Sequence, residues 1–163
     1  MELPKIAAGG TVICNRKDGV IGAVIKYKEK NCILTVYHLI KVGKCKIGSI
    51  IKIDEFKGKI IEILHDYDLV IAEIYAPSPL FEFSRIEKPE IGPAYALKGE
   101  FKNPCNIMTT GKIYHYLSFA PRSIPVPGDS GSPIIQNGKV VGILSSIFYN
   151  NATGVAVSLE LFR

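Results

Sequence analysis

Apolar and polar residues alternate along nearly the whole of this chain, in short runs rich in Ile, Val and Tyr that are broken by Gly, Asn, Asp and Pro. No run keeps helical spacing over three turns, and period-two runs of this kind are typical of β-strands. We expect strands in the first half at 10–15, 21–27, 31–36, 49–53, 59–64 and 69–74. In the second half we expect them at 94–97, 106–116, 132–136, 139–147 and 154–159.

A proline-dense stretch, APSPLFEFSRIEKPEIGP, separates the two sets of strands. Proline cannot donate to a sheet ladder, so this stretch predicts a linker, which we place at 79–93. The sequence therefore predicts an all-β chain of two six-stranded antiparallel β-barrels, one over 1–78 and one over 94–163. Within the second barrel, Asn137-Gly138 in IQNGKVV is typical of a two-residue hairpin turn.

The charge pattern argues against a nucleic-acid or membrane partner. The 163 residues carry a net charge of +5, but the lysines alternate with apolar residues, as on the solvated faces of strands, and do not cluster. The apolar runs are too short for a membrane span, and Met1–Gly10 lacks the order of a signal peptide. We therefore expect a cytoplasmic location, and the abundance of Ile and Lys is compatible with a heat-adapted source.

The four cysteines give no sign of a metal site. Cys14, Cys32, Cys45 and Cys105 form no C-x-x-C pair, and no histidine stands at ligand spacing from them. We expect no metal and no cofactor, and we expect buried free thiols. A disulfide such as Cys32–Cys45 would fit only an oxidising compartment or a hyperthermophile.

The stretch PVPGDSGSPII places two glycines around an Asp-Ser pair just before an apolar run. It can be a tight turn that leads into a strand. It can also be a nucleophile loop, because glycines let the backbone turn two N–H groups toward one reacting oxygen. The candidate nucleophile is then Ser130.

A serine nucleophile needs a base, and the base needs a carboxylate that orients it. The histidines are His38, His65 and His115. His38 ends the apolar run in CILTVYHLI, where a strand would deliver its imidazole to a barrel edge. In HDYDLVIAEI, Asp68 stands directly before the strand and is favoured over Asp66. We expect His65 to be exposed, and His115 to lie on a strand surface or to line the substrate pocket.

The order His, Asp, Ser in LTVYH, DYDLVIAEI and PGDSGSP resembles that of the chymotrypsin-like (trypsin-like) serine peptidases, in their compact bacterial, archaeal and viral branch. The likeness continues through IGPAYALKGE, MTTGKIY and GKVVGILSS, which follow the order of the second barrel in high-temperature-requirement-type proteases. We expect no peptide-binding domain of the PDZ kind. The resemblance implies the chymotrypsin-like double-barrel fold with the active site between the barrels.

The resemblance also implies roles. His38 takes the proton of the Ser130 hydroxyl, and Asp68 holds the imidazole in the useful tautomer. The oxyanion hole falls on the N–H groups of Gly128 and Ser130. In the digestive enzymes the counterpart of Asp129 pairs with an amino terminus freed by cleavage. No matching activation site lies near Met1, so we expect Asp129 to find another partner or to be solvated.

The sequence departs from the family pattern on both sides of His38. Val36 and Tyr37 replace the small residues usual before the histidine, and Leu39 replaces the usual cysteine after it.

By resemblance, the primary specificity pocket has Ile124 as its floor. Its walls are Ser145, Ser146, Ile147 and residues 154–156, which begin at Gly154. Because none of these is acidic, we expect an apolar or small side chain to be preferred over Arg or Lys.

The function predicted from the sequence is a serine endopeptidase acting on protein or peptide substrates. One alternative is a weak or inactive binding module of the same fold, motivated by the crowding in VYH. Another is contact of the basic surface with nucleic acid, which the spread of the lysines makes unlikely. A serine loop that stays inactive until a partner orders it would also fit the sequence.

Overall fold

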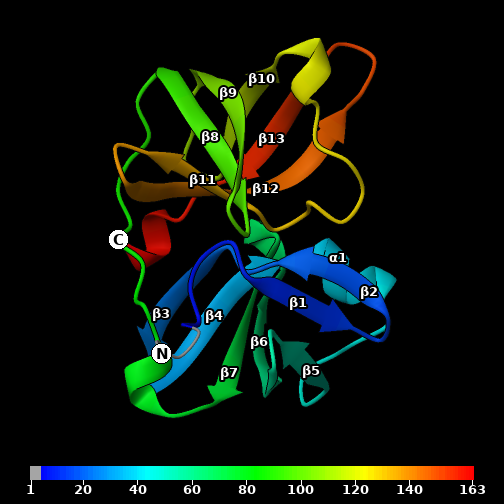
Figure 1. Cartoon of the computed structure of the whole chain (residues 1–163), viewed down its shortest axis with the longest axis vertical. Helices are drawn as coiled ribbons and strands as arrows, with labels where there is room; N and C mark the ends of the chain where they lie inside the picture. The colour runs from blue at the N-terminus through cyan, green and yellow to red at the C-terminus, as the bar shows by residue number, and fades with distance from the viewer. Residues whose placement is uncertain (1–4) are drawn as a thin grey trace.

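The structure, a computed structural model, describes residues 5–163 and consists of two antiparallel β-sheets stacked end to end (Figure 1). The first four residues of the expected N-terminal domain lie outside the described residues. In the first half the strands are β1 (Thr11–Cys14), β2 (Lys17–Val20), β3 (Ala23–Tyr27), β4 (Lys30–Val36), β5 (Ile50–Ile53), β6 (Phe56–Leu64) and β7 (Leu69–Tyr75). In the second half they are β8 (Gly92–Lys98), β9 (Phe101–Thr109), β10 (Tyr114–Phe119), β11 (Pro133–Gln136), β12 (Lys139–Phe148) and β13 (Thr153–Val157).

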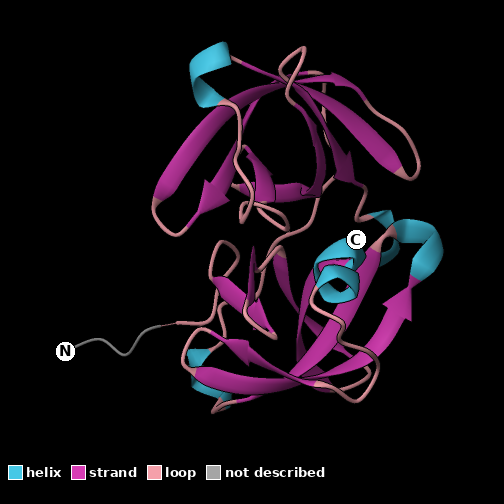
Figure 2. Cartoon of the chain, turned by 90° about the vertical axis from the view of Figure 1, so that its right-hand side faces the viewer, coloured by secondary structure: helices cyan, strands magenta, loops and turns pink. Residues whose placement is uncertain are grey.

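Helices are short and lie at the ends of strands, as Figure 2 shows. The single α-helix among the described residues is α1 (Tyr37–Val42). The turns of 3-10 helix are η1 (His65–Tyr67), η2 (Ser78–Leu80), η3 (Pro121–Ser123) and η4 (Glu160–Phe162). None of the helices within residues 5–163 has the length and hydrophobicity needed to cross a lipid bilayer.

The N-terminal sheet has seven strands in the order β2-β1-β5-β6-β7-β4-β3. Its two edge strands, β2 and β3, are consecutive in the chain and are joined only by Ile21 and Gly22, so the sheet curls far enough to bring the end of β2 next to the start of β3 without closing. The expected barrel of six strands is therefore a curled sheet of seven. Sequence patterning missed β2 because its polar start, Lys17-Asp18-Gly19, is typical of a turn.

The C-terminal sheet is a closed six-stranded barrel in the order β10-β13-β12-β11-β8-β9. The strand expected at 106–116 is in fact parts of β9 and β10, joined by a turn around Gly111. The start of β9 was missed because it contains Pro104. That proline lies opposite Tyr95 of β8, one residue before the pairing with β10 begins at Cys105, so its missing N–H interrupts no bond to β10.

The buried apolar side chains form two clusters: one fills the N-terminal sheet and continues across the junction to Ile143 and Val157 of the second half, and a smaller one lies inside the C-terminal barrel. The segment between the sheets, green along the left side of Figure 1, is pinned to both of them. Val24 N–H donates to the Ser84 hydroxyl (2.9 Å) and Ser84 N–H to the Val24 carbonyl (2.8 Å). Further along, Val140 N–H donates to the Arg85 carbonyl (2.8 Å). The relative placement of the two sheets is therefore fixed by backbone bonds.

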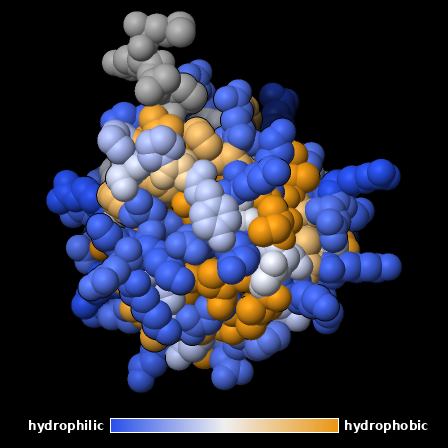
Figure 3. Space-filling model, turned by 90° about the horizontal axis from the view of Figure 1, so that it is seen from below, coloured by the Kyte–Doolittle hydropathy of each residue, from blue (hydrophilic) through white to orange (hydrophobic). Residues whose placement is uncertain are grey.

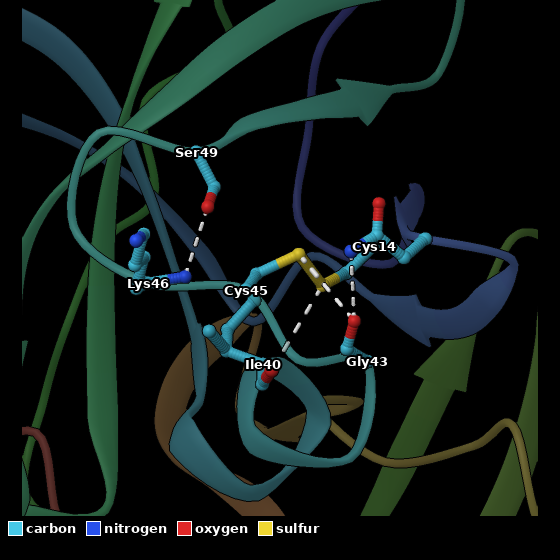
Figure 4. Close-up of a disulfide and its surroundings, with 7 residues drawn as sticks. Cys14, Ile40, Gly43, Cys45, Lys46 and Ser49 are labelled. Carbon is cyan, nitrogen blue, oxygen red and sulfur yellow. Dashed lines mark hydrogen bonds between the residues drawn. A yellow bond between two sulfur atoms is a disulfide. The ribbon is translucent and has the colours of Figure 1, made fainter.

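A disulfide joins Cys14 of β1 to Cys45, just beyond α1, with a Cα–Cα distance of 6.5 Å (Figure 4). The expectation that all four cysteines are free is therefore wrong, and so is the pairing of Cys32 with Cys45. Cys32 is buried in β4, and Cys105 is buried in the second barrel. Only the latter two remain buried free thiols.

Seen from below in Figure 3, the outer face of the N-terminal sheet shows hydrophobic residues in several groups among hydrophilic ones. Exposed large apolar side chains of this half include Ile47, Ile50, Tyr75 and Phe83. The lysines remain distributed among them, as the alternation in the sequence predicts.

Candidate active site

The pairing of β4 with β7 places two of the expected functional residues at one sheet edge. Val36, the last residue of β4, lies opposite Leu69, the first residue of β7. Tyr37 N–H then donates to the Asp68 carbonyl (2.9 Å), so the chain segments just outside the ladder stay together. His38 follows in the first turn of α1. Asp68 ends η1 with φ +51°, a left-handed conformation that Asp tolerates better than most residues.

Ser130 completes a contiguous set with these two side chains, although it lies 92 residues from His38 in the sequence. His38 Nε2 is 3.1 Å from Ser130 Oγ, which is hydrogen-bond distance. His38 Nδ1 is 3.7 Å from Asp68 Oδ2, which is ion-pair distance but too long for a hydrogen bond. The three residues singled out in the sequence are thus adjacent in the order Asp, His, Ser.

The loop that carries Ser130 is docked on the corner between β2 and β3. Val20 N–H donates to the Ser130 carbonyl (2.9 Å). Gly131 has φ +93°, and a Cβ there would lie 2.4 Å from the Val20 carbonyl oxygen and 2.6 Å from Thr35 Oγ1. Because only glycine fits so close to another backbone, this residue lets the second barrel hold its serine against the first.

Gly128 takes a left-handed conformation, with φ +98°. Asp129 N–H donates a hydrogen bond to the Val126 carbonyl (3.0 Å). Within residues 5–163, by contrast, the N–H groups of Gly128 and Ser130 donate to no protein acceptor. These two donors, which flank the Asp129 amide, are the ones expected to stabilise an oxyanion.

A second hydroxyl reaches the carboxylate from the opposite barrel. Ser145 Oγ donates to Asp68 Oδ2 (2.5 Å), the same oxygen that faces His38. The sequence placed Ser145 in a specificity pocket, and no signal in the sequence announced this contact. It depends on an irregularity in β12, where the register with β13 shifts between Leu144 and Ser146.

The sequence matches no family model and no curated protein. The fold, however, matches solved structures over almost the whole chain. A protease from Nocardiopsis matches with TM-score 0.71 at 14% identity, over 96% of this chain and 93% of that one. A chymotrypsin from Cellulomonas bogoriensis matches with TM-score 0.71 at 12% identity, over 96% and 93%. Protease A from Thermobifida fusca matches with TM-score 0.70 at 11% identity, over 96% and 92%.

The chain has the chymotrypsin-like serine protease fold. This confirms the double-barrel architecture expected from the sequence motifs. Within this fold, Asp129 has a protein partner: Lys98 Nζ lies 3.1 Å from its Oδ1, and Val126 N–H donates to its Oδ2 (2.9 Å). Of the two expectations for Asp129, another partner or solvation, the first is confirmed.

A cavity of about 460 Å³ opens beside His38 and Asp68. It is lined by His38, Asp68, Tyr114, Tyr116, Ser145, Ser146 and Val155. The two tyrosines were not anticipated as site residues. The signal for them was the alternation in YHYLSF, which puts Tyr114 and Tyr116 on one face of β10 and His115 on the other.

The residues expected to form the primary specificity pocket are partly separated in space. Ser145 and Ser146 line the cavity beside His38. Ile124 and Ile147 pack, half-buried, against the second hydrophobic core. Gly154 lies opposite Ile147 in the β12–β13 pairing, and a Cβ there would lie 3.0 Å from the Phe119 ring.

The other two histidines lie outside the site. His65 is exposed, as expected, and its ring forms a T-shaped pair with the ring of Tyr37, with centroids 4.7 Å apart. The expectation that His115 lies on a strand surface is wrong, because it shares the inward face of β10 with Leu117. It is 3% exposed and lines a separate cavity of about 650 Å³. Gly111 N–H donates to its Nδ1 (3.2 Å), and burial lowers its pKa.

Tyr37 and Leu39, two of the residues that depart from the family pattern, each pack against a neighbouring residue. Tyr37 turns its ring to His65, and Leu39 is buried against Gly19 of β2, where a Cβ would lie only 2.2 Å from it. The disulfide through Cys45 lies beyond the C-terminal end of α1, whereas Leu39 lies in its first turn.

Within residues 5–163 no group of three or more His, Cys, Asp and Glu side chains is placed to hold a metal ion.

Proposed function

We propose that this protein is a serine endopeptidase, with Ser130 as nucleophile, His38 as general base and Asp68 as the carboxylate that orients the imidazole. The observation that carries the proposal is the 3.1 Å separation of His38 Nε2 from Ser130 Oγ. A serine hydroxyl becomes nucleophilic when a positioned base can accept its proton. The proposal assigns His38 and Asp68 to a domain at 1–78 and Ser130 to a domain at 94–163, joined by the linker 79–93.

The residues present suffice for an acyl-enzyme route. Ser130 Oγ bonds to the carbonyl carbon of the substrate while its proton passes to His38 Nε2, and the N–H groups of Gly128 and Ser130 receive the oxyanion. His38 then gives the proton to the leaving amine as the C–N bond breaks. Water attacks the resulting ester, its proton passes through His38 back to Ser130 Oγ, and the carboxylic acid product leaves.

The proposed substrate is a protein or peptide with an apolar or small side chain before the scissile bond. Ile124, Ile147 and Gly154 supply no negative charge that would select Arg or Lys. The open cavity beside His38 adds the rings of Tyr114 and Tyr116, which are 41% and 53% exposed. Exposed aromatic faces next to the reacting groups favour apolar segments of substrate.

A binding module that turns over slowly is the second candidate, and one distance favours it. His38 Nδ1 lies 3.7 Å from Asp68 Oδ2, which is too long for a hydrogen bond. A base without an orienting hydrogen bond is less effective. The endopeptidase remains the better-supported function, because such contacts often tighten only when substrate is bound.

Digestion of a proteome-derived peptide library, read out by mass spectrometry of the new termini, tests the proposal. We expect cleavage after apolar or small residues by the wild-type protein, and none by Ser130→Ala or His38→Ala. Ser123→Ala, in η3 outside the site, is the matched control and should cleave as wild type does. Cleavage that persists in Ser130→Ala, or no cleavage by the wild type, would contradict the proposal.

A further inference from the structure

The cavity of about 650 Å³ that His115 lines is separate from the proposed active site. It shares no lining residue with the cavity beside His38. Its walls come from η1, the linker, the turn between β9 and β10, and the end of the chain from Ser158 to Leu161. Cavities of this size commonly bind small organic molecules, so its chemistry is worth deriving.

Hydrogen bonds and an ion pair tie the walls of this cavity together. Ser158 N–H donates to the Ile113 carbonyl (2.7 Å), which fixes the β9–β10 turn to the chain after β13. Arg163 Nη1 lies 3.7 Å from Glu87 Oε1, so the end of the chain lies beside the linker, as Figure 1 shows. The cavity is therefore formed by the fold itself, before any ligand is present.

The buried end of the cavity is the imidazole of His115, whose orientation follows from its neighbours. Nδ1 accepts Gly111 N–H (3.2 Å). Cδ2 lies beside Gly142 of β12, where an added Cβ would be 3.4 Å away. The ring atoms that remain to meet the cavity are therefore Cε1 and Nε2.

His115 Nε2 is an unpaired hydrogen-bond donor. Burial lowers the pKa of the ring, so the imidazole is neutral at pH 7, and because Nδ1 accepts a hydrogen bond the proton is on Nε2. Within residues 5–163 this buried nitrogen has no hydrogen-bond partner. A buried N–H without an acceptor is costly, so a ligand oxygen placed there gains a bond. Because the donor is uncharged, it suits a neutral acceptor better than a buried carboxylate.

The exposed rim of the cavity carries positive charge. Lys88 of the linker and Lys112 of the β9–β10 turn are exposed, and neither forms an ion pair within residues 5–163. The carboxylate of Glu160, which also lines the cavity, lies 3.6 Å from Arg163 Nη2, and this guanidinium offsets its charge. A negatively charged group is therefore favoured at the rim.

Apolar side chains supply much of the remaining wall. Ile113 and Leu161 line the cavity and are 38% and 55% exposed, and Tyr67 adds a half-buried ring. An apolar group of a ligand would cover these side chains and remove their surface from water.

We propose that this cavity binds a small organic anion whose apolar body carries a neutral hydrogen-bond acceptor. Its carboxylate lies near Lys88 and Lys112, and its acceptor, such as a ketone oxygen, takes the hydrogen bond of His115 Nε2–H. The apolar body contacts the walls between these two ends. A medium-chain oxo acid has this chemistry. The inference does not rest on the proposed function, because the cavity is separate from His38 and Ser130.

NMR titration of the histidine ring protons tests the inference with three matched compounds. The compounds are 7-oxooctanoate, octanoate, which lacks the ketone oxygen, and 2-octanone, which lacks the charge. We expect 7-oxooctanoate to shift the His115 signals saturably and to leave those of His38 and His65 in place. Octanoate should bind about tenfold more weakly, because the buried donor then lacks its acceptor. For 2-octanone we expect binding about threefold to fivefold weaker.

Variants assign each part of the ligand to its partner. In His115→Leu, 7-oxooctanoate and octanoate should bind equally, as measured by calorimetry. In Lys112→Met, the advantage of 7-oxooctanoate over 2-octanone should fall about threefold. Because Lys112 is exposed, this variant keeps the test decisive if His115→Leu fails to fold. Lys57→Met, on an exposed position of β6 that does not line the cavity, is the matched control and should bind as wild type does.

Four outcomes would overturn the inference. The first is that no compound shifts the His115 signals saturably at millimolar concentration. The second is equal binding of octanoate and 7-oxooctanoate by the wild-type protein. The third is a set of shifts confined to His38, which would assign binding to the proposed active site. The fourth is saturation by the peptide acetyl-Ala-Leu and not by the oxo acid, which would assign the cavity to the carboxyl terminus of a peptide.

Discussion

Ser145, from the C-terminal barrel, donates a hydrogen bond to the carboxylate of Asp68, from the N-terminal sheet, across the junction of the two halves. This bond fixes one carboxylate oxygen at the point where His38 Nδ1 approaches it. The hydroxyl therefore links the orientation of the proposed base to the relative placement of the two barrels.

Replacing Ser145 with Ala tests that link. Removing a hydrogen bond to a charged group typically costs about 1.5–3 kcal/mol, so we expect Ser130 to react about tenfold more slowly with a serine-directed probe. The same change should lower the thermal unfolding midpoint more than Ser118→Ala does, because Ser118 is a half-buried serine of β10 outside the site. Equal labelling rates for Ser145→Ala and wild type would show that the hydroxyl does not orient Asp68.

Gly131→Ala should loosen the contact between the serine loop and the first barrel. An added Cβ would lie 2.4 Å from the Val20 carbonyl oxygen, in a left-handed backbone conformation. Strain and overpacking together predict a loss of about 2–5 kcal/mol in the free energy of unfolding, measured in urea. Gly138→Ala is the control, because that residue also has positive φ but open space around it. Equal losses for the two variants would argue against the contact.

The buried His115 predicts a pH dependence of stability. Burial lowers its pKa below the ordinary value of 6.5, so the unfolded chain binds a proton near that pH that the folded chain does not. The contribution to stability is unchanged above about pH 6.5 and falls as the solution is made more acidic, by at most about 1.4 kcal/mol per pH unit. His115→Leu should lack this part of the slope in urea unfolding curves recorded at several pH values. Parallel curves for the two proteins would contradict the account.

Thiol titration tests the disulfide. Unreduced, denatured protein should expose two thiols, those of Cys32 and Cys105, and reduced protein should expose all four. In the folded state both free thiols should react slowly, because burial raises the pKa of Cys32 to about 11 and that of Cys105 to about 12. Four reactive thiols in the unreduced protein would contradict the Cys14–Cys45 bond.

Loss of that disulfide should also destabilise the protein. The bond closes a loop across 31 residues, and the chain-entropy account predicts a loss of about 2–4 kcal/mol for the Cys14→Ser, Cys45→Ser double variant. Cys105→Ser would separate this effect from that of replacing a buried thiol. Unfolding midpoints that do not differ between the oxidised and reduced wild type would count against a stabilising role.

The fold class was predictable because period-two patterning is a local property. His38, Asp68 and Ser130 could be singled out as candidates because each stands at a strand end or in a glycine turn, and the structure brings the three side chains together. Register and curvature were not predictable in the same way. The division of 17–27 into β2 and β3, and the bulge that aims Ser145 at Asp68, depend on contacts between segments far apart in sequence.

The sequence also did not predict which charged residues form ion pairs or which cysteines form the disulfide. Nothing local distinguishes Lys98 from other lysines at hairpin ends, yet it alone reaches Asp129 among the ion pairs of residues 5–163. Likewise, Cys45 pairs with Cys14 because the chain that follows α1 returns to β1. Such pairings follow from the three-dimensional path of the chain.

Intact-mass measurement after incubation with a fluorophosphonate tests the central claim most directly. If Ser130 is activated by His38, the wild-type protein gains the mass of a single adduct, and neither Ser130→Ala nor His38→Ala gains any. An unmodified wild-type mass after prolonged incubation, or an adduct that persists in Ser130→Ala, would contradict the claim that this site performs nucleophilic catalysis.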